Sequence, residues 1–148
     1  MEQVAVRRAT LADLDELLVL GAEYAVADGH DFDEAAARRG FRPLLVDDSI
    51  GTVLVAIVDD ALDGYAVVTW GWSIEIGGLD VVLDEVYVRS RGLGIGTLLL
   101  DVVEADCVDR GVRRIVLETE RPNDAARRLY TRRGWLEDDS IWMSKEFR

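Results

Sequence analysis

Residues 81–110 hold the feature that most constrains how this chain can fold. Residues 81–88 are almost continuously apolar and rich in β-branched side chains, as expected for a strand that is covered on both faces. Glycines at alternate positions follow, at Gly92, Gly94 and Gly96, and apolar residues then recur with helical spacing over residues 98–103. The pattern predicts a strand, a tight turn and a helix that runs to Arg110, with Gly111 as its C-cap.

The glycine-rich turn, residues 91–96, stands where the strand changes into the helix. Glycine adopts backbone dihedrals that other residues avoid, and the first helical turn has unpaired amides at the positive end of the helix dipole. Such a turn binds phosphate. The spacing is neither G-x-G-x-x-G with a later acid nor the G-K-S/T of a P-loop, so the sequence favours neither of those folds. A tight turn without a ligand stays an alternative.

Two motifs together resemble the GNAT superfamily of N-acyltransferases. The run L-D-E-V-Y-V followed by R-G-L-G-I-G resembles its acyl-CoA pyrophosphate loop, Q/R-x-x-G-x-G/A, with Arg91, Gly94 and Gly96 in the fixed positions. The superfamily's second signature is N-x-x-A-x-x-L-Y-x-x-x-G-F, and the chain resembles it at Asn123, Ala126, Leu129, Tyr130, Gly134 and Trp135, with tryptophan replacing phenylalanine. Only Arg89 and Ser90 separate Val88 from Arg91, so the loop is shorter than is common in the superfamily.

The resemblance implies a mixed α/β fold with the element order β-α-α-β-β-β-α-β-α-β-β and a central, splayed pair of parallel strands. Residue patterns place a first strand at residues 4–7, a capping box of Thr10 and Asp13 that opens a helix through Gly21, and a second helix over 33–39 that stops at Gly40. Strands follow at 52–58 and 65–70, joined by a hairpin over 59–64, and the parallel partner strand lies at 113–119. Asn123 opens the last helix, and residues 135–136 and 141–147 form a closing hairpin.

Length and composition set further expectations. The 148 residues are expected to form one domain, 1–148, that buries about two thirds of its unfolded surface. No apolar run approaches the length of about 18 residues that spans a bilayer, so we expect a cytoplasmic protein with no membrane partner. One cysteine and one histidine predict no disulfide and no metal site. The net charge of −12 opposes binding to nucleic acid and mildly favours cationic partners, although it can equally report solubility alone.

The resemblance implies acetyl-CoA as cosubstrate. Its pyrophosphate would contact the glycine-rich turn, and its thioester arm would pair with main-chain groups near residues 86–88, where an amide would serve as oxyanion donor. The residues expected to bind it are Val86, Tyr87, Val88, Arg91, Gly92, Leu93, Gly94, Ile95, Gly96, Thr97 and Asn123.

Transfer of acetyl to an amine needs a base, because an alkylamine with a pKa of about 10.4 is mostly protonated at pH 7. Asp84 and Glu85 are the candidates, but strand alternation places them on opposite faces unless a bulge intervenes, and the residues alone do not choose between them. Resemblance to polyamine acetyltransferases implies Asp84 as the amine contact and Glu85 as a base acting through water. Tyr130 matches the tyrosine that protonates the CoA sulfur in many members. Cys107 belongs to a helical pattern, so direct transfer in a ternary complex is expected.

Two stretches supply candidate acceptor contacts. Tyr24, Asp28 and His30 lie between the two expected helices, a segment that borders the acceptor site in the superfamily. A second group, Trp70, Trp72 and Glu75, could wall a pocket for an amine by cation–π and charge attraction. Surface loop positions for the first group and packing roles for the second stay as alternatives.

These observations favour an N-acetyltransferase that moves acetyl from acetyl-CoA to a primary amine of a small cationic metabolite. One alternative is acetylation of a protein lysine or N-terminus, for which an open peptide groove would be the sign. Another is a non-catalytic acyl-CoA sensor. The sequence leaves open whether the chain forms a homodimer.

Overall fold

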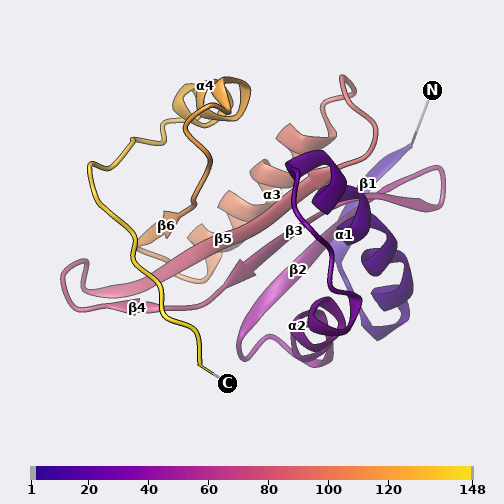
Figure 1. Cartoon of the computed structure of the whole chain (residues 1–148), viewed down its shortest axis with the longest axis horizontal. Helices are drawn as coiled ribbons and strands as arrows, with labels where there is room; N and C mark the ends of the chain where they lie inside the picture. The colour runs from indigo at the N-terminus through magenta and orange to yellow at the C-terminus, as the bar shows by residue number, and fades with distance from the viewer. Residues whose placement is uncertain (1–2, 148) are drawn as a thin grey trace. The chain divides into compact units, whose positions relative to one another are not determined.

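The computed structural model describes residues 3–147 and divides them into two compact units. The first unit ends at Leu117 and contains a six-stranded sheet with α1, α2 and α3, while the second begins at Glu118 and contains α4 (Figure 1). The mixed α/β fold predicted from the sequence is confirmed.

The sheet of the first unit is mixed. Antiparallel neighbours follow the order β1 (Val4–Arg8), β2 (Gly51–Val58), β3 (Ala61–Thr69), β5 (Gly78–Val88) and β4 (Trp72–Ser73). The strand β6 (Arg114–Val116) pairs with β5 in parallel. The predicted parallel pair on either side of the glycine-rich turn is therefore present, although β6 is shorter than the expected 113–119.

Helices cover both faces of this sheet (Figure 1). The helices α1 (Leu14–Asp28) and α2 (Glu34–Val46) pack on one face, where Leu17, Val55 and Tyr65 are among the fully buried side chains of the main core cluster. The helix α3 (Ile95–Asp109) covers the other face with Ile95 and Leu99. Each fully buried aliphatic side chain contributes about 1.5–3 kcal/mol, so the sheet is held from both sides.

The first helix begins as predicted but ends later. Thr10 caps a short 3₁₀ turn, η1 (Leu11–Asp13), and its N–H donates to Asp13 Oδ2 at 2.8 Å. The helix then continues past Gly21 to Asp28 and ends at Gly29, which has a left-handed φ of 74°. Gly21 lies inside the helix, where a Cβ would stand 3.3 Å from the Phe32 ring, so this glycine makes room for packing.

The expected stop at Gly40 is wrong. Asp33, the first residue of the predicted helix, is the N-cap of α2 and accepts a hydrogen bond from the Ala36 N–H at 3.1 Å. The helix runs through Gly40 and Pro43 to Val46. Glycine and proline inside a helix together cost about 4 kcal/mol. The apolar burial of Phe41, Leu44 and Leu45, at about 1.5–3 kcal/mol each, offsets that cost.

The hairpin between β2 and β3 is tighter than predicted. Only Asp59 and Asp60, both with positive φ, form the turn, so β3 begins at Ala61 and the expected loop over 59–64 is too long. The sheet also extends into residues 72–73 and 78–80, where the sequence predicted a connection.

The second unit holds the last predicted helix, α4 (Asp124–Arg132). Asn123 Oδ1 accepts a hydrogen bond from the Ala126 N–H at 3.2 Å, which confirms it as the N-cap, and Gly134 follows the helix with a φ of 91°. The predicted closing hairpin is wrong, because residues 135–147 contain neither strand nor helix. Their apolar side chains, such as Ile141 at 91% exposed, have the composition of a strand but no strand partner.

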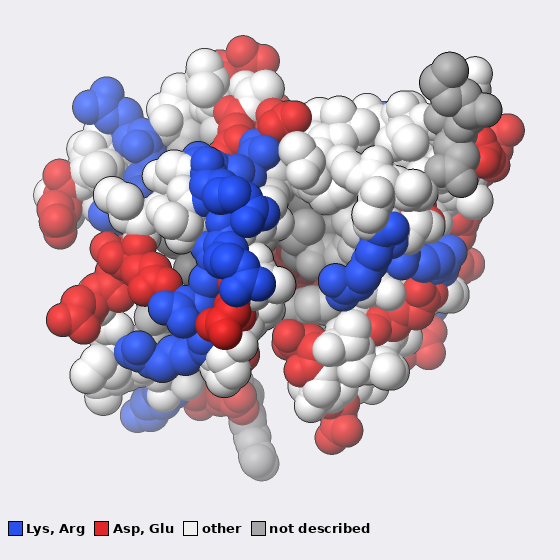
Figure 2. Space-filling view, turned by 90° about the horizontal axis from the view of Figure 1, so that it is seen from above, with Lys and Arg blue, Asp and Glu red and all other residues white. Residues whose placement is uncertain are grey.

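Acidic side chains outnumber basic ones. The sequence carries 29 acidic and 17 basic side chains, and the face that Figure 2 shows has lysines and arginines as well as aspartates and glutamates. Within residues 3–147, no helix has the length and apolar character to cross a membrane.

Candidate active site

A β-bulge at Asp84 organises the candidate site. In the pairing of β3 with β5, Val67 lies opposite Glu85 and Val68 lies opposite Leu83, so Asp84 is an extra residue. A bulge of this kind interrupts the alternation of side chains along a strand. Asp84 and Glu85 consequently line the same cavity, which strict alternation would forbid.

This cavity, of about 400 Å³, is lined by residues of α1, α2, their connection, β3 and β5. Tyr24, Phe32 and Phe41 supply aromatic walls, and four carboxylates line it: Asp31, Asp33, Asp84 and Glu85. Among the described residues that line it, none is a lysine or an arginine. An apolar space with unneutralised carboxylates suits a ligand with an apolar body and a positive charge.

Glu85 has a specific buried partner. The hydroxyl group of Tyr65, a residue that is 0% exposed, donates to Glu85 Oε1 at 2.7 Å. Burial raises the pKa of Glu85, the neighbouring Asp84 charge raises it further, and the Tyr65 hydrogen bond and His30 oppose the rise. A carboxyl group whose pKa moves toward neutrality is better matched to proton transfer near neutral pH.

Sequence reasoning missed Tyr65. It lies opposite Tyr87 in the register, which makes Glu85 its diagonal neighbour across the two strands. Only the pairing register places the two residues together, so the linear sequence carries no signal for this contact.

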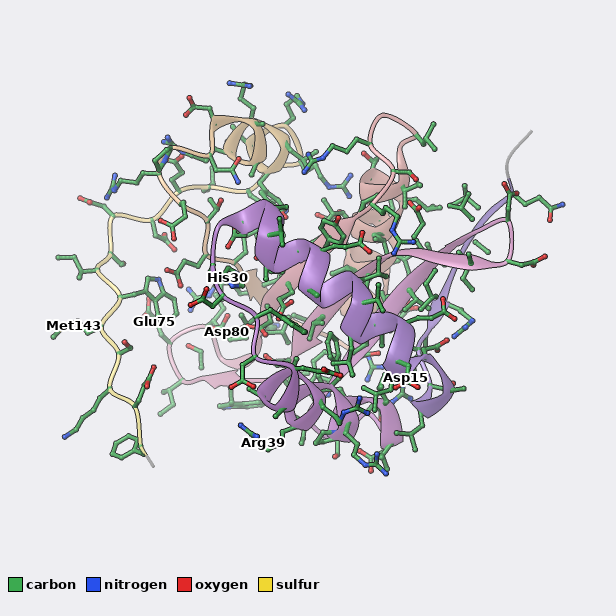
Figure 3. All side chains as sticks on the ribbon, turned by 45° about the vertical axis from the view of Figure 1, so that its right-hand side comes forward. Asp15, His30, Arg39, Glu75, Asp80 and Met143 are labelled. Carbon is green, nitrogen blue, oxygen red and sulfur yellow. The ribbon has the colours of Figure 1, made fainter. Side chains whose placement is uncertain are left out.

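The structure brings Tyr24 and His30 to the cavity. His30 lies in the connection between α1 and α2 (Figure 3), and its ring meets the Tyr24 ring edge-on at 5.7 Å. Asp28 does not line the cavity, but its Oδ2 lies 3.5 Å from His30 Nε2. Tyr24 and Asp28 belong to α1, so the expectation of a loop there is wrong.

The aromatic group at residues 70–75 lies elsewhere. Trp70 donates its Nε1–H to the Asp48 carbonyl oxygen at 2.6 Å, and Arg110 covers its ring at 4.6 Å. Trp72 is 72% exposed on β4, and Glu75 is exposed in the turn between β4 and β5 (Figure 3). None of these three residues lines the cavity.

The glycine-rich turn has the geometry of an anion cradle. Gly92 and Gly94 have φ of 80° and 75°, and Gly94 is the N-cap of α3. The amides of residues 95–97 have no acceptor in a preceding helical turn. Apart from each glycine and its chain neighbours, no heavy atom of the described residues lies within 4 Å of the position a Cβ would take at Gly92 or Gly94, so the main chain is open to a ligand. Arg91 and Leu93 are exposed beside it.

The short approach to this turn is anchored to β3. Asp63, which is buried, accepts hydrogen bonds from the Ser90 N–H at 3.1 Å and from the Ser90 hydroxyl group at 2.7 Å. The Arg89 N–H donates to the Asp63 carbonyl oxygen at 2.7 Å, and the Arg89 side chain pairs with Glu23 of α1. These contacts tie the loop to β3 and to α1.

One edge of β5 is left open beyond its first residues. Pairing with β6 covers Asp80 to Val82, and within residues 3–147 no strand continues along that edge of residues 83–88. The other edge of this stretch pairs with β3. Within the described residues, the edge of β5 opposite β3 therefore has no strand partner at residues 86–88.

Tyr130 and Asn123 belong to the second unit. The Tyr130 ring meets the Trp135 ring at 5.3 Å, and burial raises the pKa of its hydroxyl group. Asn123 caps α4, as described above. Their roles toward the cosubstrate stay predictions.

Cys107 is buried in α3, and burial raises the pKa of its thiol to about 11. A buried, protonated thiol is a poor nucleophile. Among the described residues, no three His, Cys, Asp or Glu side chains group as metal ligands would.

Comparisons with known proteins place this chain in a family. A possible acetyltransferase from Clostridium difficile 630 is 25% identical, with a TM-score of 0.86 over 98% of each chain. A ribosomal-protein-alanine N-acetyltransferase from Brucella melitensis biovar Abortus 2308 is 27% identical, with a TM-score of 0.76 over 97% of this chain and 100% of that one. An integron cassette protein from the mobile metagenome of Cole Harbour Salt Marsh is 31% identical, with a TM-score of 0.84 over 97% of this chain and 90% of that one.

No curated protein sequence matches the chain. The acetyltransferase (GNAT) family matches residues 13–135, a stretch that includes the cavity, the bulge and the glycine-rich turn. This chain therefore belongs to the acetyltransferase (GNAT) family.

Proposed function

We propose that this enzyme transfers acetyl from acetyl-CoA to a primary amine of a small cationic metabolite. The observation that carries the proposal is the bulge, which brings Asp84 and Glu85 into one cavity with aromatic walls and no basic side chain among its described lining. A carboxylate pair attracts the ammonium form of an acceptor, and one member can then accept its proton. The two roles need two acids in one place.

The proposed reaction is direct transfer in a ternary complex. Asp84 holds the cation, and Glu85 takes a proton from the ammonium group through water. The free amine nitrogen attacks the thioester carbonyl carbon, the new C–N bond forms, and the C–S bond breaks. The leaving thiolate takes a proton from Tyr130, and the acetylated nitrogen loses its second proton, which returns Tyr130 to its protonated form through solvent. A main-chain amide of residues 86–88 stabilises the oxyanion. The buried thiol of Cys107 supports a route without an acyl-enzyme.

The cosubstrate would lie along the open edge of β5 and the glycine-rich turn. The amides of residues 95–97 would contact the pyrophosphate, with Gly92 and Gly94 allowing its approach. Arg91, which is exposed, would add a positive charge. The thioester arm would pair with residues 86–88.

A second candidate is acetylation of a protein N-terminus. The similarity to a ribosomal-protein-alanine N-acetyltransferase at 27% identity favours it. The cavity of about 400 Å³ with its carboxylates supports the small amine instead, because its size suits a small ligand.

The test is a screen of small amines and N-terminal peptides with acetyl-CoA, read by release of free thiol and by the mass of the product. We expect turnover with small cationic amines and none with N-terminal peptides whose side chains are uncharged. Turnover with peptides alone would support the second candidate. Binding of acetyl-CoA by calorimetry without turnover of any acceptor would instead identify a sensor.

A further inference from the structure

Tyr65 is a buried residue that has no part in the reaction proposed above. The only polar atom of its side chain, the hydroxyl oxygen, contacts the carboxylate of Glu85. Its hydroxyl group donates to Glu85 Oε1 at 2.7 Å, and the residue is 0% exposed. Its ring is packed edge-on against Phe41 at 5.7 Å and lies 6.5 Å from the Tyr87 ring. A side chain enclosed in this way has one orientation, so the hydroxyl group is a fixed donor.

The contact engages one carboxylate oxygen. Among the described residues, no hydrogen bond engages Glu85 Oε2, while Oε1 is bound to Tyr65. A carboxylate held by one oxygen cannot rotate freely about its last torsion. The remaining oxygen then has a defined direction for an acceptor or a water molecule in the cavity that Glu85 lines.

The geometry points to Tyr65 as a positioning residue, which holds Oε1 of Glu85 and leaves Oε2 to accept the proton of the acceptor amine through water. This inference rests on the proposed function, in which Glu85 is the base. Tyr65 does not touch the substrate in this role, because it lies behind the carboxylate within the core cluster.

The hydrogen bond also acts on the charge of Glu85. Burial and Asp84 of the same strand favour its protonated form, whereas Tyr65 of β3 and His30 of the α1–α2 connection favour the carboxylate. Burial and the Glu85 charge raise the pKa of Tyr65 itself, so its hydroxyl group stays protonated and remains a donor. Other titratable groups at the cavity or beside Tyr65 are Tyr24 on α1, Asp31 and Asp33 before α2, and Tyr87 on β5.

The test compares Tyr65→Phe with the matched variant Thr52→Val, which removes a buried hydroxyl group from β2 outside the site. We expect Tyr65→Phe to move the acidic limb of the kcat/KM profile upward by about one pH unit, measured with one acceptor amine. At any pH below that limb, kcat/KM would fall about tenfold, while the affinity for acetyl-CoA stays unchanged. Thr52→Val should leave the limb in place.

A second readout is independent of activity. In protein with ¹³C-labelled glutamate carboxyl carbons, the Glu85 signal is assigned by its loss in Glu85→Gln, and its pKa is followed by NMR. We expect a higher Glu85 pKa in Tyr65→Phe than in the parent chain. An unchanged value overturns the inference whatever the activity. A raised value in a protein that acetylates no amine overturns the proposed function and leaves the Tyr65 contact supported.

Should Tyr65→Phe fail to fold, the four tyrosines can be replaced by 3-fluorotyrosine, whose hydroxyl group is a more acidic donor. The expected result is then a lower Glu85 pKa, because a stronger hydrogen bond favours the carboxylate. A Glu85 pKa that does not move overturns the inference.

Discussion

At the scale of a single residue, opposing effects set the pKa of the half-buried Glu85 carboxyl group. Burial and Asp84 raise its pKa, while the Tyr65 hydrogen bond and His30 oppose the rise. When the folded pKa lies above the unfolded one, the ionised group destabilises the fold as pH rises from the unfolded to the folded value. The feature that suits Glu85 to proton transfer therefore costs stability near neutral pH.

Glu85→Gln separates these two effects. The amide keeps an acceptor for the Tyr65 hydroxyl group but carries no charge and accepts no proton. We expect kcat to fall by about 10²- to 10⁴-fold and Tm at pH 7 to rise, with no rise in Tm at pH 4. Activity assays measure kcat, and thermal unfolding at pH 7 and at pH 4 measures Tm. Asp84→Asn is the control, and it should chiefly raise KM for the amine; equal kinetics for the two variants would contradict the division of roles.

Tyr130→Phe tests the proton donor. Because a thiolate with a cysteine-like pKa near 8.5 can leave unprotonated at some cost, we expect kcat to fall within about 10²- to 10⁴-fold and acetyl-CoA affinity to change little. The loss should shrink with an acyl donor whose thiol is more acidic. A phenylalanine variant that works at full rate would leave Tyr130 as an aromatic partner of Trp135 only.

At the scale of elements, the strand β5 and the helix α3 position the parts of the candidate site. The strand changes its side-chain alternation at one bulge, and its open edge begins where β6 ends. The turn that follows needs left-handed backbone at Gly92 and Gly94, which places the start of α3 at the carboxyl end of the strand. Each element thus provides one part of the binding surface proposed for acetyl-CoA.

Gly94→Val tests the turn. A valine at a φ of 75° is strained, and its side chain would occupy the open space proposed for the pyrophosphate, so we expect acetyl-CoA affinity to fall at least tenfold. The matched control is Gly111→Val at the other end of α3, where φ is 70° and the surrounding space is equally open. Calorimetry on both variants separates strain from lost binding. Equal affinity losses would contradict the cradle.

The whole molecule is stabilised in part by carboxylates paired with arginines across its elements. Hydrogen bonds from Arg7, Arg89 and Arg114 lower the pKa values of Asp13, Glu23 and Asp80, respectively. A carboxyl group with a lowered folded pKa adds stability above its unfolded pKa, and that stability is lost as pH falls through the folded value. The fold is therefore expected to weaken below about pH 4.

Arg7→Met tests this linkage at the pair that ties β1 to η1. Arg7 Nη1 lies 2.8 Å from Asp13 Oδ2, and Asp13 is buried. We expect a lower Tm at pH 7 and a smaller difference from the parent chain at pH 3, where Asp13 is closer to protonation. Arg38→Met is the control, because the side chains of its two partners, Asp15 and Glu34, are 91% and 65% exposed. A Tm deficit that is the same at both pH values would contradict the linkage.

The sequence by itself determined the features that depend on neighbouring residues. The caps at Thr10 and Asn123, the glycine-rich turn and the strand, turn and helix around it all follow from local backbone chemistry, and the two motifs of residues 83–135 indicated the family.

Tertiary structure decided what depends on distant partners. The bulge that aims both acids at one cavity is set by the register with β3, and the same register brings Tyr65 to Glu85. Burial of Phe41 and its neighbours carried α2 past Gly40, whereas residues 135–147 formed no hairpin despite their apolar pattern. A strand or a helix end is stabilised by what it pairs with or packs on, and a linear pattern does not specify that partner.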